Sequence, residues 1–238
     1  MKGVLDQEYA YERKRKKEYI FRYKVRAAWV KKCIENYAQK NKALQILDFG
    51  SAEGLTLLEL NKYFPDCYFT GIEYSRDLMD MAPNLPLNVK LVQGDITKLK
   101  ENIRKIKYDV IIALAVLEHL EEPDKALREA FSVLKPGGLF LATAPNPVWD
   151  HLATRLNLLN DHHQVSLTKA LLHQLITDAG LIYLDFKRFM WAPVSVLPYF
   201  NVNISPHTSL KIDEYMGDLK FMNWLCVNQM IIAQKSTS

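Results

Sequence analysis

Two different hydrophobic periodicities divide the chain. From residue 7 to residue 40 there is neither Gly nor Pro, and apolar side chains recur at intervals of three or four. This spacing predicts one long helix, or two, docked on the rest of the chain through a Tyr-rich apolar face. The positions of that face are Tyr19, Tyr23, Ala27, Val30, Ile34 and Tyr37.

From residue 44 onwards, short apolar runs alternate with amphipathic segments. The expected strands are 44–49, 67–73, 89–93, 109–114, 139–143, 181–189 and 226–234. The expected helices are 53–64, 76–81, 97–106, 123–134 and 168–179. This alternation predicts an α/β fold in which a parallel sheet has helices on both faces.

The 238 residues are enough for one core rather than two large domains. We expect a basic N-terminal helical extension at 1–43 and a single domain at 44–238. Within this domain, residues 190–225 are rich in aromatic side chains and Pro. Such a stretch suits the cover of an apolar pocket, but it equally suits a plain hydrophobic edge or the contact of a homodimer.

Composition indicates the compartment. The longest apolar run, at 110–117, is too short to span a bilayer, so no transmembrane segment is expected. The first residues lack the apolar stretch of a secretory signal. Three widely spaced Cys without a CxxC pair indicate neither a disulfide framework nor a zinc site. We therefore predict a cytoplasmic protein.

The net charge of +4 conceals a local excess of basic residues. Ten Lys and Arg stand against two Glu between residues 11 and 32, so the rest of the chain is net acidic. A solvated helix face explains this pattern. An anionic membrane surface, RNA or a phosphorylated substrate would also suit it, and the Tyr-rich face suits the roof of an active site.

The turn after the first expected strand is the first candidate for chemistry. It contains Gly50, Ser51, Ala52 and Gly54, and an amphipathic helix follows it. Glycine reaches backbone angles that a Cβ forbids and lets a ligand touch the main chain. A strand, a glycine turn and a helix are typical of the nucleotide-binding start of a doubly wound α/β domain. The spacing differs from that of pyrophosphate-binding loops, and Glu53 would repel a phosphate there.

Three further strand ends carry suitable groups, and strand ends meet at one edge of such a sheet. Glu73 is placed to accept hydrogen bonds from both hydroxyls of a ribose, and Asp95 from an exocyclic amine. The small apolar wall at 113–116 suits a ligand with little charge to neutralise. Each carboxylate taken alone is equally typical of a helix cap or a solvated loop.

These motifs together resemble those of class I S-adenosylmethionine-dependent methyltransferases, most of all the branch with quinone-biosynthesis, small-molecule and lipid enzymes. The matching strings are ILDFGSAEG (46–54), GIE (71–73), QGDI (93–96), YDVI (108–111), VLEHL (116–120) and LKPGGLF (134–140). The resemblance covers about residues 44 to 185. It implies a Rossmann-like sheet of seven strands whose last strand, near 226–234, runs antiparallel.

The resemblance also implies the cofactor, S-adenosyl-L-methionine. The implied cofactor-binding residues are Asp48, Gly50, Ser51, Ala52, Gly54, Glu73, Tyr74, Asp95, Ile96, Ala113, Leu114 and Ala115. The glycine turn would wrap the methionine part, Glu73 would take the ribose hydroxyls, and Asp95 with Ile96 would take the adenine. Ala52 departs from the family pattern, which has Gly at the middle position, and its methyl group would narrow the cleft.

Methyl transfer from a sulfonium needs mostly alignment and exclusion of water, and a base only where the acceptor must lose a proton. His163 and His119 are the candidate catalytic residues, because His titrates near neutrality. The family match falls on His163 rather than His162 by its distance from Thr168. His119 equally suits a packing role in its turn. No cluster has metal-ligand spacing, so no metal is expected.

We therefore predict an enzyme that methylates a small-molecule or lipid-like acceptor. The segment after the fourth strand lacks the Asp/Asn-Pro-Pro-aromatic pattern of amino-directed nucleobase enzymes. Two alternatives stay open: a non-catalytic methyltransferase-like binding protein, and an RNA methyltransferase that uses the basic N-terminal helix.

Overall fold

The computed structural model describes residues 7–38, 43–155, 163–219 and 222–237. The helices are α1 Gln7–Arg15, α2 Lys17–Tyr37, α3 Leu55–Tyr63, α4 Arg76–Asp80, α5 Glu101–Arg104, α6 Pro123–Val133, α7 Pro147–Arg155, α8 Lys169–Asp178, α9 Ala192–Ser195 and α10 Pro206–Asp218. Short 3₁₀ helices are η1 Leu117–His119, η2 Leu197–Phe200 and η3 Asn223–Leu225. The strands are β1 Gln45–Phe49, β2 Tyr68–Glu73, β3 Val89–Gln93, β4 Tyr108–Leu114, β5 Leu134–Pro145, β6 Ile182–Trp191 and β7 Cys226–Gln234.

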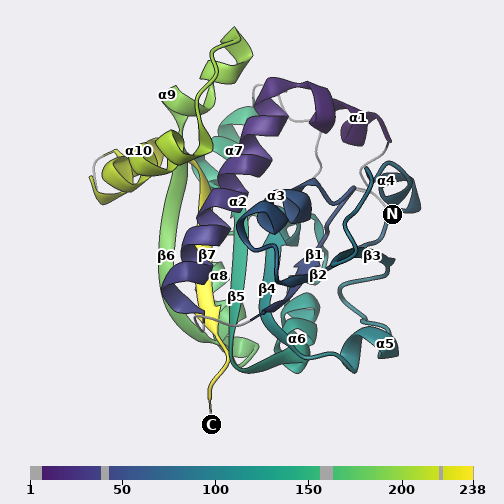
Figure 1. Cartoon of the computed structure of the whole chain (residues 1–238). Helices are drawn as coiled ribbons and strands as arrows, with labels where there is room; N and C mark the ends of the chain where they lie inside the picture. Colours follow the sequence, from purple (N-terminus) through teal and green to yellow (C-terminus); the bar gives the residue numbers. More distant parts are fainter. Residues whose placement is uncertain (1–6, 39–42, 156–162, 220–221, 238) are drawn as a thin grey trace.

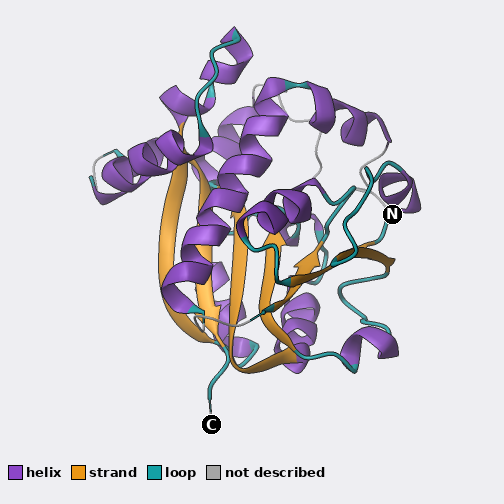
Figure 2. Ribbon diagram, in the orientation of Figure 1, coloured by secondary structure: helices purple, strands orange, loops and turns teal. Residues whose placement is uncertain are grey.

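The strands form one seven-stranded sheet in the order β3-β2-β1-β4-β5-β7-β6 (Figures 1 and 2). Neighbours from β3 to β5 are parallel, whereas β7 runs antiparallel to both β5 and β6. The predicted α/β fold with an antiparallel last strand is confirmed. Strand order reverses between β1 and β4, and the carboxyl ends of strands at such a point commonly hold a ligand.

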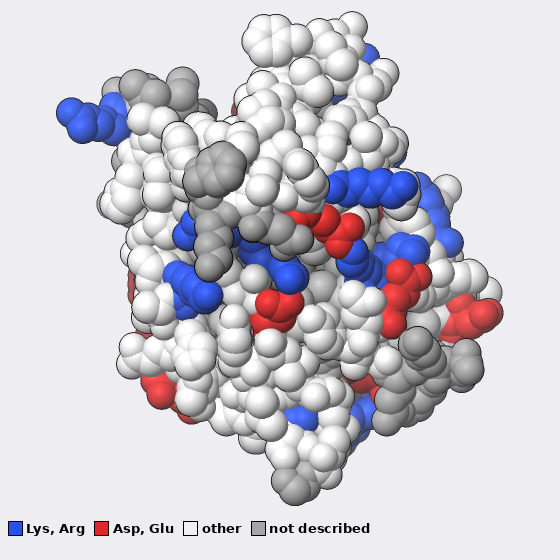
Figure 3. All heavy atoms as spheres, turned by 90° about the vertical axis from the view of Figure 1, so that its left-hand side faces the viewer, with Lys and Arg blue, Asp and Glu red and all other residues white. Residues whose placement is uncertain are grey.

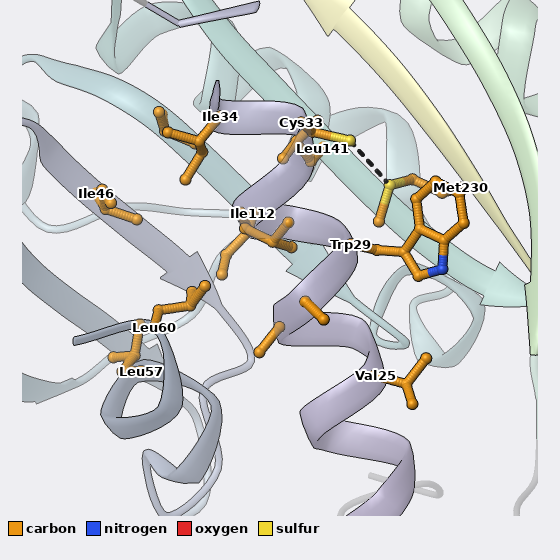
Figure 4. Packing of buried hydrophobic residues seen from close by; sticks show 14 of the residues in the cluster. Val25, Trp29, Cys33, Ile34, Ile46, Leu57, Leu60, Ile112, Leu141 and Met230 are labelled. Atoms are coloured by element: carbon orange, nitrogen blue, oxygen red, sulfur yellow. Dashed lines mark hydrogen bonds between the residues drawn. The ribbon is translucent and has the colours of Figure 1, made fainter. Parts of the chain in front are cut away.

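Helices pack on both faces of the sheet. Figure 4 shows Val25, Trp29 and Cys33 of α2 lying against the sheet, with Leu57 and Leu60 of α3 beside them. On the opposite face, α6 and α8 bury side chains such as Leu127, Ala130, Leu172 and Ile176. The two faces are thus covered by separate apolar clusters. These clusters pack against the central strands β1 and β4 from both sides.

The N-terminal segment forms two helices that meet at Lys16. Ala27, Val30 and Ile34 are buried as predicted, but Tyr19, Tyr23 and Tyr37 are only partly buried. Val25, Trp29 and Cys33 are buried in addition, so the docked face of α2 is broader than the predicted one. No helix in the described part of the chain is long and apolar enough to cross a membrane.

Two boundaries differ from the sequence prediction. The helix expected at 97–106 is only α5, because Asp95 holds a turn in which its Oδ1 accepts hydrogen bonds from the N–H and hydroxyl of Thr97, at 2.8 and 2.7 Å. The strand expected at 139–143 is longer, because β5 begins at Leu134, directly after α6. Gly137 has a φ of +72°, and its N–H donates to the carbonyl of Lys235, at 3.0 Å, so the chain just beyond β7 is bonded to the start of β5.

The described residues of 190–219 and 222–225 lie at the β6 edge and over α2 rather than over the β1–β4 end of the sheet (Figure 1). Nε1 of Trp29 on α2 donates to Oδ2 of Asp213 on α10, at 3.3 Å. Nη2 of Arg22 donates to the hydroxyl of Tyr199 in η2, at 2.8 Å. These bonds attach the segment to α2. Phe221, within the predicted cover, lies outside the described residues.

Candidate functional site

A cavity of about 350 Å³ lies at the carboxyl ends of β1 to β4. Most of the cofactor-binding residues predicted from the sequence line it: Asp48, Gly50, Ser51, Ala52, Glu73, Tyr74, Asp95, Ile96, Leu114 and Ala115. Gly54 and Ala113 do not line it, because Gly54 begins α3 and Ala113 is fully buried within β4. A pocket of this size suits a small ligand.

The loop after β1 is held by main-chain hydrogen bonds to β2. The N–H groups of Gly50 and Ser51 both donate to the carbonyl of Ile72, at 2.9 and 3.1 Å. Gly50 has a φ of +73°, and a Cβ there would lie 2.5 Å from Cγ2 of Val116. Only glycine meets both conditions, so the turn brings the main chain directly to the cavity wall.

Ala52 occupies a left-handed conformation with a φ of +47°, which glycine adopts without strain. Its side chain is buried in a small cluster with Ala10 of α1 and Leu78 of α4. The methyl group that the sequence analysis found unusual therefore contacts the helix that covers the cavity. This contact gives the substitution a structural reason.

Glu73 connects three segments at the cavity floor. Its Oε2 accepts a hydrogen bond from the N–H of Ala52 and its Oε1 one from the N–H of Ser75, both at 2.8 Å. The side chain is buried yet lines the cavity. A carboxylate has about four lone-pair positions, so it still has capacity to accept from ligand hydroxyls. Asp95 instead caps its turn with Oδ1 while lining the same cavity.

Asp48 is buried at the end of β1, and it lines the cavity. Burial raises the pKa of its carboxyl group to about 8, and the charge of Glu73 adds to this rise, whereas Arg13 opposes it. The protonated form is therefore favoured even with Arg13 in the cavity lining. A cationic group placed next to Asp48 would stabilise the ionised form.

The N-terminal helices roof the cavity, with Tyr9 and Arg13 of α1 and Arg26 of α2 in its lining. Nη1 of Arg13 lies 3.1 Å from Oε2 of the fully buried Glu53. Burial raises the pKa of Glu53, and Arg13 counteracts this effect. Tyr9, Arg13 and Arg26 do not belong to the predicted Tyr-rich face, and the other roles left open for the basic helix stay predictions. Sequence reasoning did not single out Arg13 or Arg26, and their only signal was the local excess of basic residues.

His119 lines the cavity from η1, and His163 lies beside it. Their ring centroids are 5.0 Å apart, with an angle of 63° between the planes. The carbonyl of Glu118 accepts hydrogen bonds from the N–H groups of Gln164 and Val165, at 2.8 and 3.2 Å, which holds the segment of His163 against η1. The two candidate catalytic residues are therefore brought together, whereas Asp161 and His162 lie outside the described residues.

Glu118, His119 and His163 form a group whose ligand atoms all lie within 4.8 Å of one another. Such a set of one carboxylate and two imidazoles is able to hold a divalent metal ion. The sequence did not indicate this group, because His163 is far from the other two along the chain. The expectation of no metal stays a prediction.

The site is thus a cavity at the switch point of a doubly wound α/β domain, with the carboxylates of Asp48, Glu73 and Asp95 in its lining. A family model described as a methyltransferase domain matches residues 40–182. The chain belongs to this methyltransferase domain family, which confirms the resemblance found in the sequence.

Individual relatives match only part of the chain at moderate identity. The chain is 33% identical over 112 residues to malonyl-[acyl-carrier protein] O-methyltransferase of Halalkalibacterium halodurans, a match that covers 45% of this chain and 41% of the relative. The chain thus spans less than half the length of this relative.

Two solved structures show the same fold. The plantazolicin methyltransferase BpumL, in complex with a pentazolic desmethylPZN analog and SAH, is similar with a TM-score of 0.66 and 18% identity, over 97% of this chain and 90% of that one. The [4+2]-cyclase SpnF is similar with a TM-score of 0.60 and 19% identity, over 88% and 81%.

Proposed function

We propose that this protein transfers a methyl group from S-adenosyl-L-methionine to a small-molecule or lipid-like acceptor. The observation that carries the proposal is the convergence of Asp48, the Gly50 turn, Glu73 and Asp95 on one cavity in a chain of the methyltransferase domain family. A relative named ubiquinone biosynthesis O-methyltransferase, 31% identical over 107 residues, supports a small-molecule or lipid-like acceptor.

The residues of the cavity fit this cofactor. Glu73 would accept from the ribose hydroxyls, and Asp95 with Ile96 would contact the adenine. Gly50 and Ser51 would contact the methionine part, and the buried Asp48 would face its ammonium group. When bound, the cofactor supplies an electrophilic methyl group.

The chain's own contribution is alignment, exclusion of water and, for a hydroxyl acceptor, removal of a proton. The roof formed by α1 and α2 would limit the access of water to the cavity. His119 and His163 are the candidate groups to accept the proton, since His119 lines the cavity and the centroid of the His163 ring lies 5.0 Å from that of His119. His163→Gln should then lower kcat and remove an ionisation from the pH profile of methyl transfer.

An RNA acceptor receives less support. Several basic residues of α1 and α2 are paired with carboxylates: Arg13 with Glu53, Lys16 with Glu12, Lys31 with Glu35, and Lys32 with Glu214. On the face that includes α10 and β6, basic side chains lie among acidic ones rather than forming an uninterrupted basic surface (Figure 3). Binding to a nucleic acid or an anionic membrane stays a prediction.

Calorimetry with S-adenosylmethionine and S-adenosylhomocysteine tests the cofactor. Wild-type protein should bind both, and Glu73→Ala should abolish binding. Absence of binding by the wild type would favour a non-catalytic binding protein instead. A cell extract incubated with labelled cofactor and the protein should then show which fraction takes up the label, and therefore the chemical class of the acceptor.

A further inference from the structure

Arg26 is a second cationic side chain in the cavity, and its surroundings differ from those of Arg13. It lies on α2, and its Nη2 donates to Oδ1 of Asn228 on β7, at 3.3 Å. The amide of Asn228 is itself oriented, because its Nδ2 donates to Sδ of Met190, at 3.0 Å. The guanidinium group is thus fixed at the cavity wall by a neutral partner.

No ion pair of Arg26 occurs among the described residues, and the carboxylate that influences it is Glu118, whose charge raises its pKa. Arg13 has Glu53, whereas no carboxylate of the described residues forms an ion pair with Arg26. Its Nε is buried and has no hydrogen-bond partner in the described part of the chain. Burial lowers the pKa of Arg26 to about 10, so the side chain is still protonated at neutral pH. Arg26 is partly buried, and a cation with a buried, unused donor is stabilised when an anion binds it.

The position of Arg26 separates it from the residues expected to bind the nucleoside. Asn228 pairs with Pro145 of β5 and with Phe189 of β6, on the far side of β4 from β2 and β3. Glu73 and Asp95 follow β2 and β3. An anion held by Arg26 would therefore lie on the β5–β7 side of the cavity, whereas the expected nucleoside lies on the β2–β3 side.

We propose that Arg26 binds a carboxylate or phosphate group of the methyl acceptor, an assignment that rests on the proposed methyltransferase function. The planar guanidinium group is suited to both anions, because it presents parallel N–H donors. The acceptor is accordingly an acidic small molecule. The carboxylate of the cofactor's methionine part has the same chemistry and is the alternative source.

The test uses the full chain saturated with S-adenosylhomocysteine, titrated with malonate and with inorganic phosphate by calorimetry. We expect saturable binding that Arg26→Met weakens at least tenfold. Arg22→Met is the matched control, since Arg22 lies one turn earlier on α2 and bonds to Tyr199 outside the cavity; it should leave the affinity unchanged. Equal binding by wild type and Arg26→Met would overturn the proposal.

The source of the anion is decided by comparing S-adenosylhomocysteine with 5′-methylthioadenosine, which lacks the amino-acid carboxylate. Arg26→Met should change the affinity for S-adenosylhomocysteine and the affinity for 5′-methylthioadenosine by no more than about threefold each. If Arg26→Met weakens the binding of S-adenosylhomocysteine but not that of 5′-methylthioadenosine, Arg26 binds the carboxylate of the cofactor, and the proposal is overturned. If Arg26→Met fails to fold, Arg26→Lys replaces it, and unchanged anion affinity in that variant would count against the proposal.

Failure of the inference is separable from failure of the proposed function. Wild-type protein that binds S-adenosylhomocysteine but neither anion would overturn the role of Arg26 alone. Wild-type protein that binds no S-adenosylhomocysteine would overturn the methyltransferase function on which the inference rests.

Discussion

The main-chain N–H of Ala52 donates a 2.8 Å hydrogen bond to Oε2 of Glu73. This bond joins the loop after β1 to the end of β2, while Oε1 of the same carboxylate accepts from Ser75. Glu73 therefore fixes the shape of the cavity floor as well as facing the cavity. Substitution of this residue affects both the loop and the ligand.

Glu73→Gln should weaken the binding of S-adenosylhomocysteine by at least about tenfold. An amide has one acceptor oxygen, so either Ala52 or Ser75 loses its partner, and a hydrogen bond to a charged group contributes about 1.5–3 kcal/mol. Calorimetry measures the loss. Asp77→Asn, an exposed carboxylate on α4, is the control and should bind as the wild type does. Wild-type affinity in Glu73→Gln would contradict the proposed role.

Asp48→Asn should alter the dependence of stability on pH. Unfolded Asp48 ionises near 3.8, whereas the folded residue keeps its proton to about pH 8. Its contribution to the free energy of unfolding is therefore full below pH 3.8 and is lost as the pH rises to about 8. Relative to the wild type, Asp48→Asn should gain stability at pH 8 and nothing near pH 4. Urea unfolding at both pH values checks this, and an equal effect at both would argue against a protonated Asp48.

The ion pair of Arg13 and Glu53 should hold α1 over the cavity. Arg13→Met leaves the buried Glu53 carboxylate without its partner, which costs more than removing both charges. Hydrogen exchange of residues 7–15 should therefore rise more in Arg13→Met than in the double variant Arg13→Met/Glu53→Gln. Equal exchange in the wild type and in Arg13→Met would show that the ion pair does not fasten this helix.

Gly71→Ala on β2 should displace the loop after β1, because the added methyl group collides with Ser51 of that loop. A Cβ at Gly71 would lie 2.4 Å from Oγ of Ser51 and 2.6 Å from Cδ2 of Leu91. Both side chains must move, at a cost of about 1–3 kcal/mol in stability, and cofactor affinity should fall with it. Gly217→Ala is the control, because its Cβ would meet the carbonyl of Arg188 at 3.4 Å, an ordinary contact. Thermal unfolding and calorimetry measure both effects.

Features that depend on neighbouring residues could be predicted from the sequence. Thr168 was expected to begin a helix, and its Oγ1 accepts from the N–H of Leu171, at 3.1 Å. The last strand has the predicted bounds, 226–234. The α5 helix was predicted too long, because an apolar pattern does not reveal that Asp95 holds its own turn with Thr97.

The sequence by itself determined which side chains stand at the ends of β1 to β4, since each follows its strand directly and parallel strands end at one edge. Only the tertiary structure decided which side chains of α1 and α2 lie opposite these strand ends. Arg26 meets Asn228 across 202 positions, and Arg13 meets Glu53 across 40. Such contacts depend on how α1 and α2 dock on the finished sheet, and no local pattern of residues encodes that geometry.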